Sequence, residues 1–408
     1  MQRQTGRYER THFGGEEVAA FVPEPLPPQN PSLTLDGALL KRLHRAEDAL
    51  RRLDLAGEMV PSLDWFIYAF VRKEAVLSSQ IEGTQATLVD LLTFESEESP
   101  PPNADIEEVC NYLDALGFAR SQIADPHGLP LSLRLLNETH KHLMRGVRGV
   151  RGATKQPGQI RWSQNWIGGS RPGNAMYVPP PPSLLPELLS SLEKYIHHDD
   201  GLPPLVRAGL LHVQFETIHP YLDGNGRIGR LLVTLLLEHW KLLTKPLLYL
   251  SLFLKRHRTE YYRLLNAVRK EGEWEPWIDF FLDGVATISE EATASARDLF
   301  ALVATDRERV LSHDSASVAA IRLFEALPRH PIVSVATAMR LLQTSKPTAT
   351  RAIEVLSEAG ILQESTGKKR DRSFAYHRYL ERLRDGTELG TVASARLEHS
   401  AGSGQPGR

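Results

Sequence analysis

The sequence has little cysteine, little excess charge of either sign and few long apolar runs. Cys110 is the only cysteine among 408 residues, which excludes a disulfide framework and any zinc or iron–sulfur site built from several thiolates. The formal net charge is −2, from 48 Lys and Arg against 50 Asp and Glu, which argues against a protein built mainly to coat nucleic acid. One small basic module is still compatible with that charge, and a single thiol fits a reducing compartment.

Signals for a membrane or for export are also lacking. The most apolar stretch, residues 231–254, is interrupted by Glu238, Lys241 and Lys245, too densely for a helix that spans a bilayer. Residues 1–12 lack the apolar core of a signal peptide. We therefore expect a soluble, cytoplasmic protein that has no membrane partner.

The composition and periodicity indicate a folded, mainly α-helical chain of roughly two to four domains. Apolar residues make up 41% of the chain and charged residues 24%, as in globular proteins. The first thirty residues are polar and then proline-rich, and we expect them to be extended. Apolar residues at helical steps predict helices at 36–53, 65–79, 109–118, 131–144 and, with interruptions, 184–281. A glycine- and proline-rich segment at 154–182 predicts an irregular hairpin on the surface.

The pattern after residue 318 predicts a small separate module. The predicted helices and strands are, in order, helices at 319–327, 335–342 and 347–359, and strands at 361–363 and 373–376. Ser345 and Pro347 are good start signals for the third helix, and Gly360 is a good stop signal. The module resembles a winged helix–turn–helix.

One stretch, residues 219–230, carries most of the chemistry, with the sequence His-Pro-Tyr-Leu-Asp-Gly-Asn-Gly-Arg-Ile-Gly-Arg. Apolar residues at helical spacing precede and follow it, so a tight polar loop is expected between two buried helices. Pro220 ends the first helix and places the imidazole of His219 at a fixed corner. A histidine has the intrinsic pKa needed to take a proton from a hydroxyl near neutral pH.

The glycines and charged residues of this loop predict a site for a phosphate chain. Gly224 and Gly226 let the backbone turn with its N–H groups exposed at a helix N-terminus, which favours anions. Asp223 beside that site would repel phosphate unless a cation lay between them, which suggests Mg²⁺. Arg227 and Arg230 are one turn apart on the same helix face, a natural fork for a polyphosphate tail. Together these residues indicate nucleotide transfer onto a hydroxyl.

Other interpretations of the loop are weaker. Gly224-x-Gly226-x-x-Gly229 also matches a dinucleotide-binding fingerprint, but that motif follows a strand, and the preceding periodicity here is helical. A purely structural turn between two helices would explain the glycines and Pro220, but not a histidine, an aspartate and two arginines in one loop. The sequence has no G-x-x-x-x-G-K-[ST] pattern, which excludes a Walker-type nucleotide-binding protein.

The loop resembles the signature of Fic-domain proteins, HPFx(D/E)GNGRxxR, and departs from it only by Tyr221 in place of phenylalanine. The resemblance extends over about residues 10–285 and includes Trp-Ile-Gly-Gly at 166–169. Most Fic proteins transfer AMP from ATP to a Ser, Thr or Tyr of a protein. The resemblance therefore implies that His219 is the catalytic base and that Asp223 holds Mg²⁺.

By the same resemblance the loop would bind ATP. Gly224–Gly226 would form the anion hole, and Arg227 and Arg230 would hold the β- and γ-phosphates. Tyr261 and Tyr262 could border the adenine, but adjacent helical residues point about 100° apart, so at most one is expected to face it. The residues expected to contact ATP are Glu82, Asp223, Gly224, Asn225, Gly226, Arg227, Ile228, Gly229, Arg230, Tyr261 and Tyr262.

Residues 78–83, Ser-Ser-Gln-Ile-Glu-Gly, fit the (S/T)xxxE(G/N) inhibitory motif of Fic proteins whose inhibitory helix precedes the catalytic core. The resemblance implies that Ser78, Glu82 and Gly83 form this motif and that Glu82 pairs with Arg230. A bidentate pair would occupy the fork that the γ-phosphate needs. The alternative is that Glu82 and Gly83 only end a helix.

The segment with Trp166, Ile167, Gly168 and Gly169 resembles the Fic flap, which presents the target segment by strand addition. The partner expected there is a protein with a Ser, Thr or Tyr hydroxyl, which could be this protein itself. An ordinary surface loop is the alternative.

The C-terminal module has two interpretations, DNA binding and protein interaction or dimerisation, and composition does not separate them. In the first, the third helix would lie in a groove and the basic hairpin would lie on phosphates as a wing. The residues that could contact DNA are Lys346, Thr348, Arg351, Lys368, Lys369 and Arg370.

The predicted organisation has four parts: a helical region with the inhibitory motif at 1–105, a Fic core at 106–290, a winged helix–turn–helix at 291–385 and a disordered tail at 386–408. The leading hypothesis is a protein adenylyltransferase that uses ATP and Mg²⁺ and is restrained by Glu82. Alternatives are an ATP-sensing DNA-binding regulator, or a Fic enzyme that uses another phosphate-containing donor or removes AMP. A homodimer is expected from similar proteins.

Overall fold

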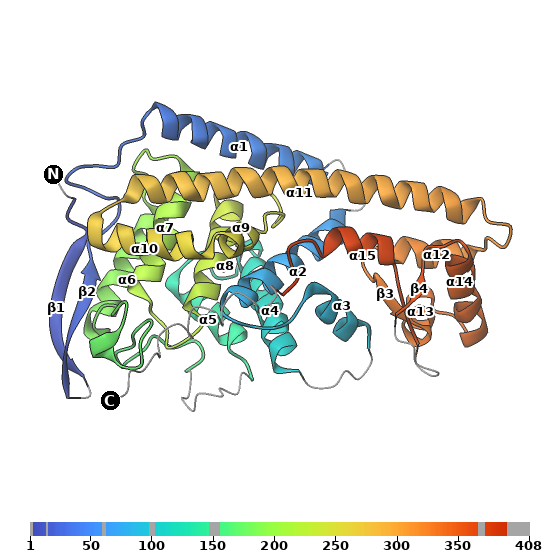
Figure 1. Cartoon of the computed structure of the whole chain (residues 1–408), viewed down its shortest axis with the longest axis horizontal. Helices are drawn as coiled ribbons and strands as arrows, with labels where there is room; N and C mark the ends of the chain where they lie inside the picture. The colour runs from blue at the N-terminus through green and yellow to red at the C-terminus, as the bar shows by residue number, and fades with distance from the viewer. Residues whose placement is uncertain are drawn as a thin grey trace, which may run out of the picture.

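One long helix runs along most of the molecule and organises the fold. In the computed structural model, α11 (Trp274–Leu311) follows the long axis, and α1 (Gly37–Glu58) lies beside it (Figure 1). Leucines at helical spacing put one apolar face of α1 in the core. On the rim of this contact, Arg42 and Arg45 of α1 both pair with Asp283 of α11.

The structure describes residues 3–13, 15–58, 63–97, 103–146, 156–365 and 372–389. The prediction of a mainly helical fold is confirmed. The remaining α-helices are α2 (Leu63–Ile81), α3 (Leu88–Ser96), α4 (Ala104–Ala124), α5 (Leu133–Leu143), α6 (Leu185–His197), α7 (Pro204–Ile218), α8 (Asn225–His239), α9 (Ser251–Arg256), α10 (Arg258–Glu271), α12 (Val318–Ala326), α13 (Val335–Leu342), α14 (Lys346–Glu358) and α15 (His377–Leu383). Two 3₁₀ turns, η1 (Pro172–Asn174) and η2 (Pro182–Leu184), flank the end of the predicted surface hairpin.

Helix α7 lies at the centre of the core. Its side chains are buried from Leu205 through Ile218, as expected for a helix that is surrounded on all sides. Gly209 lets α11 approach closely, because a β-carbon there would lie 3.0 Å from side-chain atoms of Ile278 and Phe281. The indole of Trp277 also donates a hydrogen bond to the Gly209 carbonyl at 2.9 Å. This packing fixes the position of α7 and therefore of the loop that follows it.

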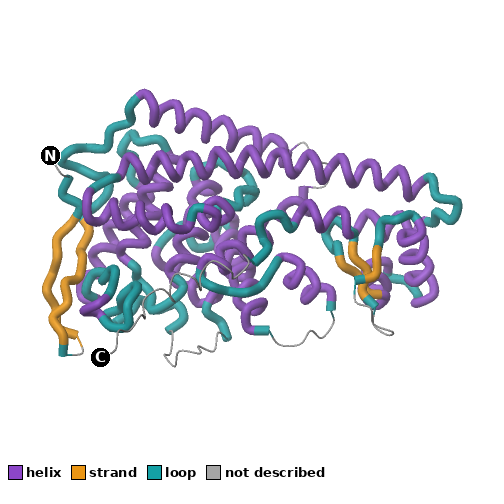
Figure 2. The backbone as a smooth tube through the Cα atoms, in the orientation of Figure 1, coloured by secondary structure: helices purple, strands orange, loops and turns teal. Residues whose placement is uncertain are grey.

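Strands lie near the two ends of the molecule (Figure 2). At one end β1 (Gly6–Phe13) and β2 (Glu16–Pro23) pair antiparallel, with Tyr8 opposite Phe21. The sequence predicted an extended segment here, and the pairing of its two halves as a hairpin was not foreseen. Val18 and Ala20 of β2 pack against Val178, which explains why the hairpin has an apolar face.

At the other end, the three helices and two strands expected for the C-terminal module are present, together with a strand that the sequence did not predict. After α12, strand β3 (Ile332–Ser334) precedes α13 and α14, and β4 (Gln363–Glu364) and β5 (Ser373–Ala375) follow. The three strands form one antiparallel sheet in the order β3-β5-β4. The predicted wing residues Lys368, Lys369 and Arg370 lie outside the described residues.

The chain after α15 returns to the helical core. The Gln80 side-chain amide donates to the Thr387 carbonyl at 2.8 Å, and the Lys255 ammonium donates to the Gly386 and Glu388 carbonyls at 3.1 and 2.9 Å. Residues 386–389 are thus held against α2 and α9, contrary to the expectation that the disordered tail begins at 386. The rest of that predicted tail lies outside the described residues.

Two of the expected domain boundaries lie inside helices. The boundary between 105 and 106 lies in α4, and the boundary between 290 and 291 lies in α11. Sequence patterns mark where composition changes, whereas a long helix can belong to the packing on both sides of such a change.

Within the described residues, no helix combines the length and the apolar character required to span a membrane.

Candidate active site

The candidate catalytic histidine lies where α7 ends. His219 has φ 51° and ψ 61°, a left-handed conformation that ends the helix, and its N–H still donates to the Phe215 carbonyl at 2.9 Å. The residue as a whole is half-buried, and its Nδ1 is buried and has no hydrogen-bond partner among the described residues. Burial, together with the positive charges of Arg161 and Arg269, lowers the pKa of His219 to about 3. The imidazole is therefore neutral at pH 7, the form that can accept a proton.

The loop after His219 is held by its own side chains. Asn225 accepts from the Tyr221 N–H and donates to the Tyr221 carbonyl, both at 2.8 Å. The Tyr221 ring is buried, and its hydroxyl donates to Asn137 at 2.9 Å. The departure from phenylalanine is therefore accommodated by a polar partner. Because the Asn225 side chain is engaged with the loop, any contact of Asn225 with a nucleotide would come from its backbone.

The same loop ends at the N-terminus of α8, where an anion site was predicted. Gly224 has φ 78°, a conformation that favours glycine, and α8 begins at the next residue. The first N–H groups of an α-helix have no acceptor within the helix and point outward. The Asp223 carboxylate accepts the Gly224 N–H at 2.6 Å, and its side chain is 40% exposed beside this N-terminus.

His140 of α5 supports this loop, and sequence analysis missed it. Its ring stacks on Tyr221 with centroids 3.9 Å apart, and its Nδ1 accepts the Gly158 N–H at 2.9 Å. The proton is therefore on Nε2, which donates to the Asp223 carbonyl at 3.0 Å. Burial lowers the pKa of His140 to about 4, so this arrangement is neutral near pH 7. Position 140 within an amphipathic helix carries no sequence signal that distinguishes it from an ordinary core histidine.

The two loop arginines point to different carboxylates rather than forming one fork. Arg227 donates to Glu108 of α4 at 3.0 Å and lies 3.8 Å from Asp223. Arg230 donates to Glu82 at 2.6 Å. Each guanidinium is only 3% exposed. Both cations are thus paired with carboxylates that precede the loop in the chain, on α4 and just after α2, and the part played by Glu108 was not expected from the sequence.

The contact between Glu82 and Arg230 has the partners that the inhibitory motif implied, with a different geometry. Arg230 donates its Nε–H to the Ser78 hydroxyl and an Nη2–H to the Ser78 carbonyl, both at 2.9 Å. Glu82 therefore accepts one hydrogen bond from Arg230, and the expected bidentate pair is not formed. Although burial disfavours the charge, the Glu82 carboxylate raises the pKa of Arg230 above its ordinary value. A β-carbon on Gly226 would lie 2.2 Å from Glu82, so only glycine allows this approach.

The segment that carries Glu82 turns sharply after α2. The Glu82 N–H donates to the Ser79 carbonyl at 3.0 Å, and Gly83 follows with φ 104°, where other residues would be strained. Gly83 therefore ends the helix, as the alternative interpretation held. The same turn brings Glu82 to Arg230, so ending the helix and contacting the arginine are compatible.

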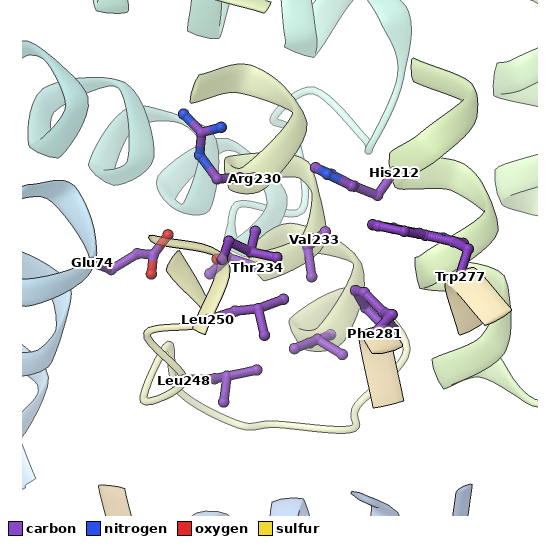
Figure 3. Close-up of a pocket in the computed structure, with 11 residues that line it drawn as sticks. Glu74, His212, Arg230, Val233, Thr234, Leu248, Leu250, Trp277 and Phe281 are labelled. Atoms are coloured by element: carbon purple, nitrogen blue, oxygen red, sulfur yellow. The ribbon is translucent and has the colours of Figure 1, made fainter. Parts of the chain in front are cut away.

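Behind Arg230 lies a small buried cavity of about 10 Å³, lined by Glu74, His212 and apolar residues of α8, α9 and α11 (Figure 3). This volume holds about one water molecule, so it cannot take a nucleotide. His212 is hydrogen-bonded to the Gly229 carbonyl at 3.1 Å and to the Tyr261 hydroxyl at 2.9 Å. Gly229 and Ile228 lie in the buried part of α8.

The two tyrosines proposed for the adenine lie differently, as their helical spacing implied. Tyr261 is buried and stacked among core residues, with its hydroxyl on His212. Tyr262 is exposed, with Arg258 over its ring at 5.7 Å. Tyr262 is therefore the member of the pair that is accessible to a nucleotide.

The predicted flap is a loop with one β-bridge, between Ile167 and Tyr177. Gly168 and Gly169 have φ values of 68° and 75°, which turns the chain back, and both are exposed. Trp166 packs against the small apolar cluster of β2. The Tyr177 hydroxyl donates to the Thr217 carbonyl at 2.6 Å, which ties the flap to the end of α7.

The candidate DNA-contacting residues that the structure describes are exposed on α14. These are Lys346, Thr348 and Arg351. Arg351 also lies within 3.3 and 3.4 Å of Glu354 and Glu358 on the same helix. The helix surface is therefore of mixed charge.

Comparison with known proteins supports the resemblance seen in the sequence. The Fic/DOC family N-terminal model matches residues 40–121, and the Fic/DOC family model matches residues 130–237. Curated relatives named protein adenylyltransferase Fic include those of Drosophila willistoni, 26% identical over 262 residues, and Drosophila grimshawi, 30% identical over 260 residues. These matches cover 62% and 61% of this chain but 45% and 48% of the relatives, so the matched part spans about half of their length.

A solved structure has the same fold over most of the chain. A Fic family protein from Desulfovibrio desulfuricans G20 is 21% identical and superposes with a TM-score of 0.54, covering 84% of this chain and 97% of that one. The matched family segments contain both the Glu82 turn and the loop from His219 to Arg230. The chain therefore contains a Fic/DOC N-terminal domain at residues 40–121 and a Fic/DOC domain at residues 130–237.

Proposed function

We propose that this protein transfers AMP from ATP to a Ser, Thr or Tyr hydroxyl of a protein, and that Glu82 restrains the reaction. The observation that carries the proposal is that one loop, from His219 to Arg230, holds a neutral imidazole, the N-terminus of α8 and two buried arginines. The name of the curated relatives supports ATP and a protein as the two substrates.

The phosphate chain would bind along the loop. The N–H groups from Gly224 to Gly226 would hold phosphate oxygens at the positive end of α8. Arg227 and Arg230 would exchange Glu108 and Glu82 for the outer phosphates, whose higher charge makes them stronger acceptors. The adenine would lie toward Tyr262, the exposed member of the tyrosine pair.

The chemical step would use His219 as the general base. Because Nδ1 is buried, Nε2 is the ring nitrogen that can face an incoming hydroxyl. The hydroxyl gives its proton to Nε2 as its oxygen bonds to the α-phosphorus, and the bond from that phosphorus to the bridging oxygen breaks, releasing pyrophosphate. Most of the rate enhancement would come from positioning and from stabilisation of charge by fixed donors.

The donor set beside the loop fits a magnesium ion that arrives with the nucleotide. Mg²⁺ commonly binds one or two carboxylates together with substrate phosphates, and Asp223 offers a partly exposed carboxylate next to the anion site. Among the described residues, no group of three or more His, Cys, Asp or Glu could hold a metal. When bound, the ion would neutralise phosphate charge.

Glu82 would restrain transfer by competing with the γ-phosphate for Arg230. A preference of about 2.8 kcal/mol for the closed pair would lower productive ATP affinity roughly 100-fold. The hydrogen bonds from Arg230 to Ser78 supply part of that preference, because they keep the guanidinium oriented toward α2.

The decisive experiment compares two labels of ATP on the purified protein. Label from the α position that stays on protein, in wild type and more strongly in Glu82→Gly, is expected for AMP transfer, and mass spectrometry would locate the modified hydroxyl. Label that is retained only from the γ position would indicate phosphoryl transfer and contradict the proposal. Release of AMP from a premodified protein, without transfer, would favour the AMP-removing alternative.

A second candidate concerns the C-terminal module. The order of its helices and strands supports a winged helix–turn–helix, and we propose DNA or a second protein surface as its partner. The mixed charge around Arg351 favours a protein partner. Salt-dependent retention on DNA would favour the other choice.

A further inference from the structure

Arg161 lies between the flap and the catalytic corner and bonds to both. Its Nε donates to the His219 carbonyl at 2.9 Å, its Nη2 to the Pro180 carbonyl at 2.6 Å and its Nη1 to the Ser163 carbonyl at 3.2 Å. Its backbone N–H donates to the Pro220 carbonyl at 2.9 Å. Arg161 thus bonds to the carbonyls of His219 and Pro220 at the corner. It also bonds to the carbonyls of Ser163 and Pro180, which precede and follow the flap bridge between Ile167 and Tyr177.

The Arg161 guanidinium has no ion-pair partner among the described residues, although its residue is only 1% exposed. A buried cation without a carboxylate is costly, and burial accordingly lowers the pKa of Arg161 to about 10. Its N–H groups instead donate to three backbone carbonyls. No neutral side chain has enough donors to bond to all three. Such an arrangement indicates a role in fixing the backbone.

The backbone at this corner needs external support. His219 has a positive φ, which is strained for a residue with a β-carbon, and the last carbonyls of α7 have no partner within the helix. Arg269 donates to the Glu216 carbonyl at 3.3 Å and to the Thr217 hydroxyl at 3.2 Å. Together with Tyr177 on the Thr217 carbonyl, these bonds hold the end of α7 from α10 and from the flap.

We propose that Arg161 is a positioning residue that sets the register between the flap, on which an acceptor segment would lie, and the imidazole of His219. This inference rests on the proposed AMP transfer. A second set of contacts holds the phosphate-binding turn, namely Asn225 on Tyr221 and His140 on Asp223. Loss of the Arg161 side chain is therefore expected to impair transfer to the acceptor and to leave ATP binding largely intact.

The charge of Arg161 has a separate effect on His219. The groups that act on the imidazole are Arg161 and Arg269, which lower its pKa, and Asp223 and the Glu216 carbonyl, which raise it. Removing one cation is expected to raise the pKa of His219, so the acid limb of the pH profile would move to higher pH. A lysine at position 161 would restore the charge but not the three carbonyl contacts.

The test compares Arg161→Gln and Arg161→Lys, each in the Glu82→Gly background, with a matched control. Arg207, in the first turn of α7, is also buried and donates to carbonyls at the end of α6, those of Tyr195 and His198, at the opposite end of α7 from His219. Arg207→Gln therefore removes a similar structural bond without touching the flap. Thermal unfolding and the folded fraction of each variant would be measured first, and rates would be given per folded molecule.

For Arg161→Gln we expect kcat/KM for the protein acceptor to fall about 100-fold, as for a misplacement near 1 Å, while ATP affinity changes less than about threefold. Arg161→Lys should recover the pH profile but only part of the rate, and Arg207→Gln should change neither. The positioning role would be overturned if Arg161→Gln lowered ATP affinity as much as it lowers kcat/KM for the acceptor. It would also be overturned if Arg207→Gln lowered transfer as much as Arg161→Gln does.

Hydrogen exchange gives a readout that does not depend on activity. Arg161→Gln should speed exchange together in residues 163–180 and 216–220, whereas Arg207→Gln should affect only the end of α6. Unchanged exchange in either of the two segments would refute the inference. If the Glu82→Gly parent transfers no AMP, the proposed function fails, and the exchange result still decides whether Arg161 couples the flap to the corner.

Discussion

The corner between α7 and α8 and the C-terminal module both contain basic residues that the sequence marks as candidate phosphate contacts. In the structure, the surroundings of these residues differ. At the corner, Arg227 and Arg230 are almost fully buried, and each bonds to a carboxylate, Glu108 of α4 and Glu82 after α2. In the C-terminal module, Arg351 is 53% exposed and lies near Glu354 and Glu358 of its own helix.

The difference lies in what each environment demands of a charge. A buried cation is stable only where acceptors or an opposite charge surround it, so the surroundings of the two arginines are closely specified and are consistent with the proposed phosphate site. An exposed ion pair contributes about 0–1 kcal/mol, so its arrangement carries little information about function. Substitutions at the corner should therefore have large and specific effects, and those on α14 should have small ones.

The largest effect is expected from His219→Ala. Removing the base should lower AMP transfer about 1,000-fold, within the usual contribution of general base catalysis, while ATP still binds. The measurement is incorporation of α-labelled ATP together with nucleotide affinity. His44→Ala, an exposed histidine of α1, is the control. If His219→Ala labels as well as wild type, the corner is not the catalytic site.

Glu82→Gly should have the next largest effect, in the opposite direction. Freeing Arg230 should raise transfer and productive ATP affinity by about 10- to 100-fold, the range expected for removal of a competing pair. Glu95→Ala breaks another glutamate–arginine pair of the same region, with Arg72, and should leave both quantities unchanged. Equal rates of AMP transfer for Glu82→Gly and wild type would show that Glu82 does not restrain the reaction.

The pH dependence tests the electrostatics of the corner. An imidazole with an ordinary pKa near 6.5 would lose about tenfold in activity between neutral pH and pH 5.5. Because the pKa of free His219 is lowered to about 3, kcat/KM should change less than about twofold over that range. The profile is best measured with Glu82→Gly, and a midpoint near 6.5 would contradict the described environment.

A smaller effect is expected where DNA is offered to the C-terminal module. Lys346→Glu should weaken retention on duplex DNA at most about fivefold and lower the salt dependence by about one charge. Lys41→Glu, an exposed change on α1, is the control. If Lys346→Glu weakened DNA retention 100-fold or more, α14 would be a helix that contacts DNA specifically. Its exposed basic residues would then matter as much as the buried arginines of the corner.

The smallest effect should come from the contact that joins the two regions. Gln80 lies in the turn before Glu82 and donates to the Thr387 carbonyl after α15. Gln80→Ala should loosen that turn and raise AMP transfer about threefold, consistent with loss of a hydrogen bond of roughly 0.5–1.5 kcal/mol. Gln363→Ala, an exposed glutamine of β4, serves as control. A decrease in rate would show that the chain after α15 does not support the closed state.

Much of the site could be predicted because its residues are close in sequence. His219, Asp223 and the two arginines lie within twelve residues, and the glycines between them allow only a tight turn into a helix. The helical faces on both sides were equally clear, since apolar spacing reports burial directly. The prediction of Ser78 and Glu82 came from a motif, and the structure adds that Ser78 takes two of the Arg230 hydrogen bonds.

Other features arise only when distant segments meet. Glu108 and His140 lie on α4 and α5, with no local pattern to mark them, and they reach the loop through helix packing. Arg161 is one arginine in an irregular segment, and its role depends on carbonyls contributed by three different stretches of chain.

The local order of residues was thus enough to specify a mainly helical chain and a tight, glycine-rich turn with a histidine at its start, because turns and helix faces depend on near neighbours. Which carboxylates neutralise the arginines, which tyrosine is exposed and how the flap is tied to the base were settled by packing. Those outcomes depend on distances between residues far apart in the chain, such as Glu82 and Arg230, which are separated by 148 positions. Sequence spacing carries no information about such distances until the helices are assembled.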